Sequence, residues 1–192
     1  MTARGLREGL REGFDRQTHW VWLVDGSTAP EPSALERLLE AVENLGSLSP
    51  PVLLASKVVT PDGALDPGSL PTPRARELDF AVAACQQHLV ALRVARRTSL
   101  LVHRRGFEAC GLPRTGSLPG GDDLEWTARL LRHEPGVLVP SSVAIRRPRG
   151  KQPRVELAAR LRLLRSDALA RGEKPWFAFR LIEDAVRNLR RR

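Results

Sequence analysis

The sequence has little sulfur and no long apolar run. Cysteine occurs twice, at Cys85 and Cys110, methionine once, and tyrosine not at all. Two cysteines are too few for a disulfide framework or a structural zinc site, so we expect both to be buried thiols in a reducing compartment. No stretch approaches the roughly 20 apolar residues of a membrane span, and residues 1–9 lack the apolar segment of a signal peptide. These absences predict a cytoplasmic protein, with peripheral contact at the inner face of the membrane as the alternative.

Basic residues outnumber acidic ones, 31 to 22, which gives a formal net charge of +9. Such an excess favours an anionic partner: a sugar nucleotide, a lipid phosphate, a membrane surface or nucleic acid. With 42% hydrophobic residues in 192, the chain can bury one sizeable core. We expect residues 1–150 to form one α/β domain and residues 151–192 to form a helical extension packed on it.

Hydrophobic spacing in the first third of the chain alternates between helix and strand. Residues 4–14 place Leu6, Leu10 and Phe14 four apart, which predicts an amphipathic helix. An apolar strand is expected over 20–24, a helix from Ser33 to near Gly46, and a buried strand over 52–59. Strand, helix, strand is the pattern of an α/β fold.

The rest of the chain predicts shorter elements. Residues 61–77 contain four prolines and are expected to form a surface loop, and a second flexible segment is expected over 111–121. Beyond Pro153 the apolar spacing predicts two basic amphipathic helices. The remaining expected elements are strands over 88–94, 98–103, 137–139 and 143–145, and helices over 105–110 and 122–133.

Two adjacent carboxylates, Asp122 and Asp123, stand at a helix start after Gly120 and Gly121. In this position a carboxylate can face a pocket and serve as a general base. The same residues also suit a structural role, because Asp122 is a favourable N-cap and Glu125, three residues on, completes a capping-box-like pair. Spacing alone leaves both interpretations open.

A second acidic residue, Asp25, ends the apolar run that begins at Trp20 and precedes Gly26 and Ser27. At the end of a strand it could bind a ribose or a cation, and it could equally cap the turn. We keep both interpretations.

Several motifs in order resemble those of a known family. They are Trp22-Leu23-Val24-Asp25, Pro30-Glu31-Pro32-Ser33-Ala34-Leu35-Glu36, Ala55-Ser56-Lys57-Val58-Val59, Ser99-Leu100-Leu101-Val102-His103-Arg104-Arg105, Gly121-Asp122-Asp123-Leu124-Glu125-Trp126 and Val139-Pro140-Ser141-Ser142-Val143. Together they cover roughly residues 4–147. In this order they resemble the glycosyltransferases of family 2, which have the GT-A fold, and among them the galactofuranosyl- and rhamnosyltransferase-like members.

The resemblance implies an α/β fold: a truncated GT-A-like three-layer sandwich with a mixed sheet, followed by the C-terminal amphipathic helices. It also implies inverting transfer of a sugar from a nucleotide-sugar donor to a cell-envelope or lipid-linked glycan. In this family pattern the base is Asp123, with Asp122 as its neighbour. The resemblance assigns the acceptor to Trp126 and Glu125, and the donor diphosphate to Asp25, Ser27 and Arg146. For Trp126 the alternative is a helix residue that faces the core.

The sequence departs from the family pattern in three places. Ser27 stands where the family has a second metal-binding acid, and Arg146 stands where it has a metal-binding histidine. We therefore expect no bound metal, and a divalent cation only together with a nucleotide-sugar; Arg146 should contact the diphosphate instead. The family's first nucleotide-binding unit has no counterpart before Met1, so a partner glycosyltransferase, or a homodimer formed through the exposed sheet edge, is expected.

Two other functions remain open. The first is a non-catalytic glycosyltransferase homologue that binds a partner transferase or a glycan. The second is a basic membrane- or nucleic-acid-binding module, since the apolar stripe of the last helix is bordered by Lys174, Arg180, Arg187, Arg190, Arg191 and Arg192. The alternative for this helix is packing on the domain with a solvated basic face. Nucleic acid is the less favoured partner, because no recognised binding module accompanies the charge.

Overall fold

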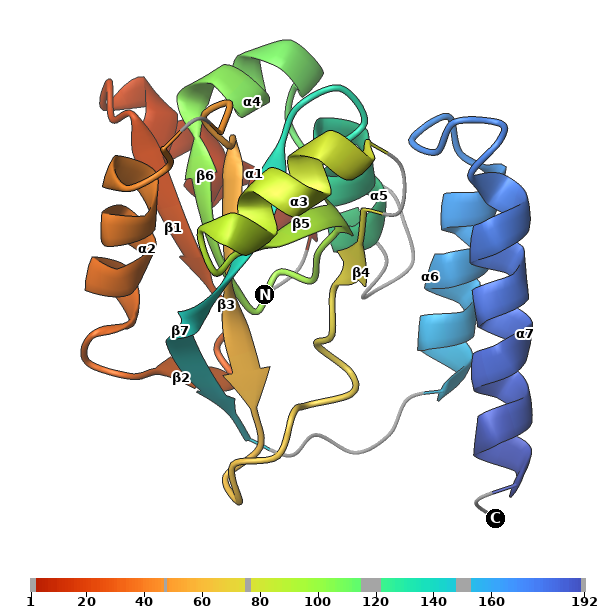
Figure 1. Cartoon of the computed structure of the whole chain (residues 1–192). Helices are drawn as coiled ribbons and strands as arrows, with labels where there is room; N and C mark the ends of the chain where they lie inside the picture. The colour runs from red at the N-terminus through yellow and green to blue at the C-terminus, as the bar shows by residue number, and fades with distance from the viewer. Residues whose placement is uncertain (1–2, 47, 75–76, 115–121, 148–152, 191–192) are drawn as a thin grey trace.

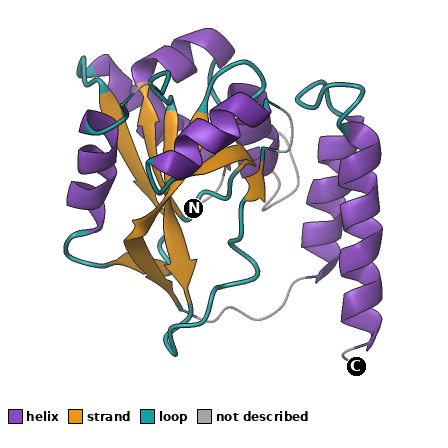
Figure 2. Cartoon of the chain, viewed as in Figure 1, coloured by secondary structure: helices purple, strands orange, loops and turns teal. Residues whose placement is uncertain are grey.

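The computed structural model describes residues 3–46, 48–74, 77–114, 122–147 and 153–190; for 3–4, 122, 153–156 and 184–190 it describes the backbone only. The described strands form one seven-stranded mixed sheet, in the order β1-β6-β3-β7-β5-β4, with β2 also pairing with β7 (Figures 1 and 2). The strands are β1 (Trp20–Val24), β2 (Thr28–Pro30), β3 (Leu53–Val59), β4 (Thr72–Pro73), β5 (Val90–Val94), β6 (Ser99–His103) and β7 (Gly136–Arg146).

Helices cover both faces of the sheet. The core on one face takes side chains from α1, α4 and α5, and the core on the other takes them from α2 and α3. The helices are α1 (Ala3–Asp15), α2 (Ala34–Glu43), α3 (Leu78–Gln86), α4 (Arg104–Cys110), α5 (Asp122–Leu130), α6 (Pro153–Arg165) and α7 (Lys174–Arg190). The predicted α/β sandwich with a mixed sheet is confirmed.

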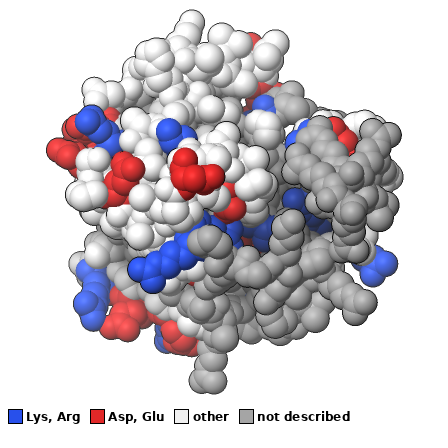
Figure 3. Space-filling model, turned by 90° about the horizontal axis from the view of Figure 1, so that it is seen from below, with Lys and Arg blue, Asp and Glu red and all other residues white. Residues whose placement is uncertain are grey.

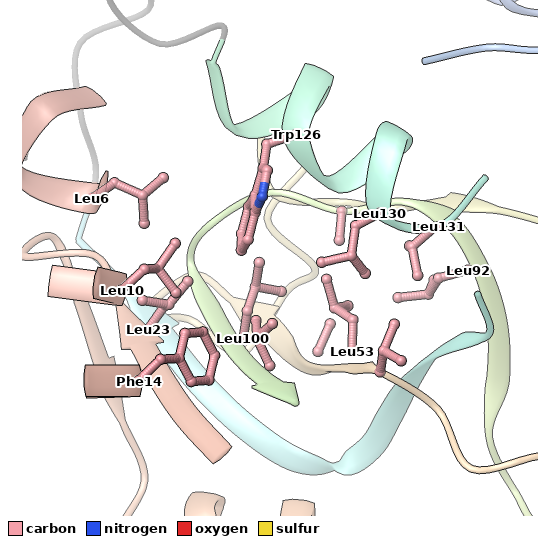
Figure 4. Close-up of a cluster of buried hydrophobic side chains, with 14 residues drawn as sticks. Leu6, Leu10, Phe14, Leu23, Leu53, Leu92, Leu100, Trp126, Leu130 and Leu131 are labelled. Carbon is pink, nitrogen blue, oxygen red and sulfur yellow. The ribbon is translucent and has the colours of Figure 1, made fainter. Parts of the chain in front are cut away.

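The core under α1 and α5 is built from long aliphatic and aromatic side chains (Figure 4). Leu6, Leu10 and Phe14 are all buried, as their four-residue spacing predicts for one face of a helix. The helix approaches β1 closely at Gly13, where an added Cβ would come within 2.8 Å of Val21. Glycine at this position therefore lets α1 lie directly on the sheet.

A row of buried hydroxyls crosses the other face of the sheet. Ser56 Oγ on β3 lies 2.7 Å from Ser99 Oγ on β6 and 2.8 Å from Ser142 Oγ on β7. Trp22 Nε1 donates to Ser99 Oγ at one end of the row, and Ser142 Oγ donates to the carbonyl of Ala34 at the other. Because each buried hydroxyl has a partner, the row links four strands and α2 without a desolvation penalty.

Strand direction places the ends of three strands together. β6 is antiparallel to both β1 and β3, and β3 is parallel to β7. The carboxyl ends of β1, β3 and β7 therefore point to the same end of the sheet, which is the lower end in Figure 1.

The expected strands over 137–139 and 143–145 are in fact one strand, β7, and predicting two was wrong. Its pairing with β3 passes from Ser56↔Val139 to Lys57↔Val143, so the residues between form a bulge. Pro140 lies in this bulge, where its missing N–H costs no ladder hydrogen bond. Helix α3 lies between the predicted loop over 61–77 and the predicted strand over 88–94, where no element was predicted, and the short strands β2 and β4 were not predicted either.

The two C-terminal helices lie beside α5 (Figure 1). Ala159 and Leu163 of α6 pack against Leu124 and Ala128 of α5, and Leu169 closes the cluster. None of the helices in the described part of the chain is long and apolar enough to cross a membrane.

Candidate functional site

Two acids that are far apart in sequence hydrogen-bond to adjacent residues of the connection between β5 and β6. The backbone N–H of Asp25 donates to the carbonyl of Thr98 (3.1 Å). The backbone N–H of Arg97 donates to Oδ2 of Asp123 (3.4 Å). Asp25 and Asp123 therefore bond to adjacent residues, at the carboxyl end of β1 and the amino end of α5.

Asp25 caps the turn after β1, which is one of the two roles that the sequence left open for it. Its carboxylate accepts hydrogen bonds from the N–H (3.3 Å) and Oγ (3.2 Å) of Ser27, and its carbonyl accepts one from the N–H of Thr28 (2.8 Å). Asp25 is only 7% exposed. The carboxylate thus organises the turn from β1 into β2 and places Ser27 and Thr28 next to the end of β7.

Asp123 is the second residue of α5. Its Oδ1 accepts from the N–H of Leu124 (3.0 Å), and Oδ2 accepts from Arg97 as described above. The side chain is half-buried at the amino end of the helix, where backbone N–H groups favour a negative charge. The side chain of Asp122, and Gly120 and Gly121 before it, lie outside the described residues, so the predicted capping by Asp122 stays a prediction.

The two residues expected to bind an acceptor are buried, and this expectation needs correction. Trp126 is 0% exposed, its ring lies in the core shown in Figure 4, and its Nε1 donates to the carbonyl of Gly111 (3.0 Å). Glu125 is also buried, with Oε1 lying 3.1 Å from Arg129 Nε and 3.6 Å from Arg114 Nη1. In this structure Trp126 is a core residue and Glu125 an ion-pair partner, because both point from α5 into the protein.

Arg146, the last residue of β7, pairs with Thr28 of β2. It therefore lies beside the Asp25–Ser27 turn, as expected for a common site. Its Nη1 donates to Asp66 Oδ2 (3.0 Å) and Ser69 Oγ (2.6 Å) in the connection after β3. Sequence spacing did not predict this acidic partner.

Two polar residues that the sequence reasoning did not single out also lie at this end of the sheet. Lys57 is half-buried, and strand alternation puts it on the same face of β3 as Ala55, the face covered by α5. Thr28 is buried, and its hydroxyl makes no hydrogen bond within the described part of the chain. A lysine inside an apolar strand was the available signal for Lys57; the unpaired hydroxyl could be seen only in the structure.

Figure 3 looks onto this end of the molecule and shows Lys and Arg side chains gathered near its middle. Within the described residues, no three His, Cys, Asp or Glu side chains are grouped so that they could hold a metal ion. Asp25 with the Ser27 hydroxyl is far from the six oxygen ligands of a Ca²⁺ or Mg²⁺ site. These residues do not form a cation site by themselves.

Two hollows in the described surface lie elsewhere. One of about 250 Å³ is lined by Arg74, Glu77, Arg132, His133, Ala170 and Glu173. The other, of about 170 Å³, is lined by Trp20, Val42, Pro50, Pro51, His103 and Arg105, at the opposite end of β1 from Asp25. Neither hollow is lined by Asp25 or Asp123.

No protein-family model matches the chain, and no curated protein matches it.

Proposed function

We propose that the chain is a glycosyltransferase-like protein that transfers a sugar, with inversion, from a nucleotide-sugar to a hydroxyl of a cell-envelope or lipid-linked glycan. One observation carries the proposal: Asp25 and Asp123 bond to the adjacent residues Thr98 and Arg97. A donor-side acid and an acceptor-side base must lie this close if they serve one reacting centre.

The proposed reaction needs one proton acceptor. Asp123 takes the proton of the acceptor hydroxyl, whose oxygen forms a bond to the anomeric carbon from the face opposite the diphosphate. The bond between that carbon and the diphosphate oxygen breaks, and its electron pair leaves with the nucleoside diphosphate. The N–H groups of Leu124 and Arg97 hold the carboxylate in place.

The leaving diphosphate needs positive charge. Both of the hydrogen bonds given above for Arg146 use Nη1, so Nη2 and Nε are the donors that would address two phosphate oxygens as a bidentate pair. Lys57 supplies a second cation on the face of Asp123. The Thr28 hydroxyl, which is buried without a partner in the described structure, supplies a further polar contact.

The experiment is a transfer and hydrolysis assay of the full chain over a panel of uridine and thymidine diphosphate sugars, with and without Mn²⁺. Asp123→Asn should lower the rate by about 10²- to 10⁴-fold, the contribution of a general base, while calorimetry shows nucleotide binding within twofold of the unmodified chain. The matched control is Asp79→Asn, an exposed acid in the first turn of α3, which should leave both quantities unchanged.

Two outcomes count against the proposal. If no nucleotide-sugar binds, the donor site is wrong. If donors bind and transfer is unchanged by Asp123→Asn, Asp123 is not the base. Nucleotide binding without any transfer would support the non-catalytic homologue instead.

A specific feature of α7 favours a second function, contact with an anionic membrane surface. Phe177 packs into the cluster under α6, whereas Phe179 and Ile182, on another side of the same helix, are each 63% exposed. Arg180 and Lys174 lie among them. A helix with one packed and one exposed apolar side, bordered by basic residues, is suited to the headgroup region of a bilayer.

Sedimentation with vesicles tests this second function. The chain should bind vesicles of phosphatidylcholine with phosphatidylglycerol more tightly than phosphatidylcholine alone, and the double substitution Phe179→Ser with Ile182→Ser should abolish binding. The same substitutions should not change binding to duplex DNA. Binding of the variant to the phosphatidylglycerol vesicles as tight as that of the original chain would refute membrane contact through α7.

A further inference from the structure

One edge of the sheet is an apolar strand with a regular set of outward-facing backbone groups. Among the described strands β1 (Trp20–Val24) is the end strand, and its one partner there is β6. It contains no charged residue, no proline and no bulge. These are the devices by which proteins block unwanted pairing at sheet edges.

The other edge of the sheet is blocked. There β4 has only two residues, Thr72 and Pro73, and its pairing with β5 shifts register between them. Shortness, a proline and an irregularity together prevent strand addition. The two edges of the sheet therefore differ: β4 is protected against the addition of another strand, and β1 is not.

The alternation of hydrogen bonds along β1 identifies the backbone groups that face away from β6. The N–H of Arg104 donates to the carbonyl of His19, and the N–H of Asp25 donates to the carbonyl of Thr98. In an antiparallel pair the residues that exchange hydrogen bonds alternate along the strand. Odd-numbered residues of β1 therefore bond to β6, and even-numbered ones point their N–H and C=O away from it.

The outward-facing residues are Trp20, Trp22 and Val24. Their backbone groups on this edge have no hydrogen-bond partner in the described structure. The odd number of residues in β1 puts one outward-facing residue, Trp22, at the centre of the strand. A strand of this kind is complementary to itself when it is turned by 180° about that residue.

We propose that β1 pairs antiparallel with β1 of a second copy of this chain, with the two-fold axis at Trp22, and so joins two sheets into one. This proposal does not rest on the proposed enzymatic function. In this register Trp22 lies opposite Trp22 of the second copy, Trp20 lies opposite Val24, and all three outward-facing residues bond on each side. Aromatic and aromatic–β-branched pairs are the favourable cross-strand neighbours.

The residue just after β1 does not add a charge pair across the axis. Asp25 is 7% exposed and its carboxylate is hydrogen-bonded to Ser27 within its own turn, so the pairing rests on the backbone groups and on the side chains of β1. The two-fold axis also brings the two α1 helices to the same side of the joined sheet. Each α1 carries the ion pair of Arg11 with Asp15, and its Glu12 pairs with Arg16 just after the helix, so neither helix presents a single sign of charge.

The experiment compares the full chain with Val24→Pro. Proline removes the outward-facing N–H of Val24 and leaves every bond from β1 to β6 in place; Val24→Thr, which keeps the N–H, is the matched control. Sedimentation equilibrium should give twice the chain mass of 21.3 kDa for the original chain and for Val24→Thr. It should give a single chain mass for Val24→Pro, with unchanged circular dichroism.

Amide hydrogen exchange of the original chain tests whether β1 forms the interface and which of its N–H groups face the second copy. In the dimer the amides of Trp20 and Trp22 should exchange at least about tenfold more slowly than after dilution to monomer, while those of Val21 and Leu23 stay protected in both states. A monomer at all concentrations overturns the proposal. So does a dimer in which Trp20 and Trp22 exchange as fast as in the monomer, because that dimer uses another surface.

Discussion

Arg93 on β5 and Glu173 before α7 form a buried bidentate ion pair, with Nε–Oε1 at 2.6 Å and Nη2–Oε2 at 2.9 Å. Their side chains are 5% and 14% exposed. The same guanidinium donates to the carbonyls of Ala128 on α5 and Ala168 after α6. This one side chain therefore ties the C-terminal helices to the sheet.

Removing one partner of the pair should be costly. Glu173→Ala leaves the Arg93 guanidinium buried with an unpaired charge, and we expect a loss of about 3 kcal/mol in the free energy of unfolding by urea. The matched control is Glu12→Ala, which breaks the exposed pair with Arg16 and should change stability by less than about 1 kcal/mol. Equal effects of the two substitutions would show that the buried pair does not hold the helices.

A substitution of Trp126 distinguishes a structural role of its ring in the core from binding of an acceptor sugar. Trp126→Ala should lower the free energy of unfolding by about 3 to 5 kcal/mol, because it opens a cavity among buried leucines. Trp176→Ala, at a 36% exposed tryptophan of α7, should cost less than about 1 kcal/mol. A Trp126→Ala variant of normal stability would place the ring outside the core.

His103 should make stability depend on pH. Its Nδ1 accepts a hydrogen bond from the N–H of Arg105 at the start of α4. Burial, and then the nearby charges of Arg105 and His19, lower the pKa of His103 below its usual value near 6.5. The unfolded chain therefore binds a proton at a pH where the folded chain does not, so this residue's contribution to stability is present above pH about 6.5 and is lost as the pH falls below it.

Thermal unfolding between pH 7.5 and pH 5 measures this effect. His103→Asn keeps a side-chain acceptor at the N-cap and does not titrate, so the variant should lose less stability on acidification than the original chain. Parallel curves for the two proteins would contradict the prediction.

The two cysteines should react at very different rates. Burial raises the pKa of the Cys110 thiol to about 11, so at pH 8 only about one molecule in a thousand carries the thiolate. Cys85 is exposed, and the expectation that both thiols are buried was wrong for it. Iodoacetamide should label one thiol quickly, and Cys85→Ser should abolish that fast phase; fast labelling that survives Cys85→Ser would refute the assignment.

Arg146 should decide diphosphate affinity if a nucleotide binds. Arg146→Ala removes a charged hydrogen-bond donor and should weaken binding by about 1.5 to 3 kcal/mol, which calorimetry with uridine diphosphate measures. Arg146→Lys keeps the charge but cannot form the bidentate hydrogen bonds of a guanidinium, so it should retain only part of the affinity. Binding that is indifferent to both substitutions would remove Arg146 from the site.

Much of the fold followed from the sequence by itself. Apolar spacing predicted α1, β1 and β3 to within a residue or two, because the period of a helix or strand is a local property of the chain. It also predicted the layered α/β class. It did not predict β2 and β4, which are two or three residues long and exist because β7 and β5 pair with them.

The candidate site depended on the tertiary structure far more. Sequence motifs selected Asp25 and Asp123, but only the path of the β5–β6 connection brings them to adjacent residues. The sequence left two roles open for Trp126, and only the packing of α5 on the sheet shows that Trp126 and Glu125 are both buried. Strand order and register bring Asp66 to Arg146 and turn the backbone groups of Trp22 away from β6. Both are set by contacts between residues that are distant in the chain.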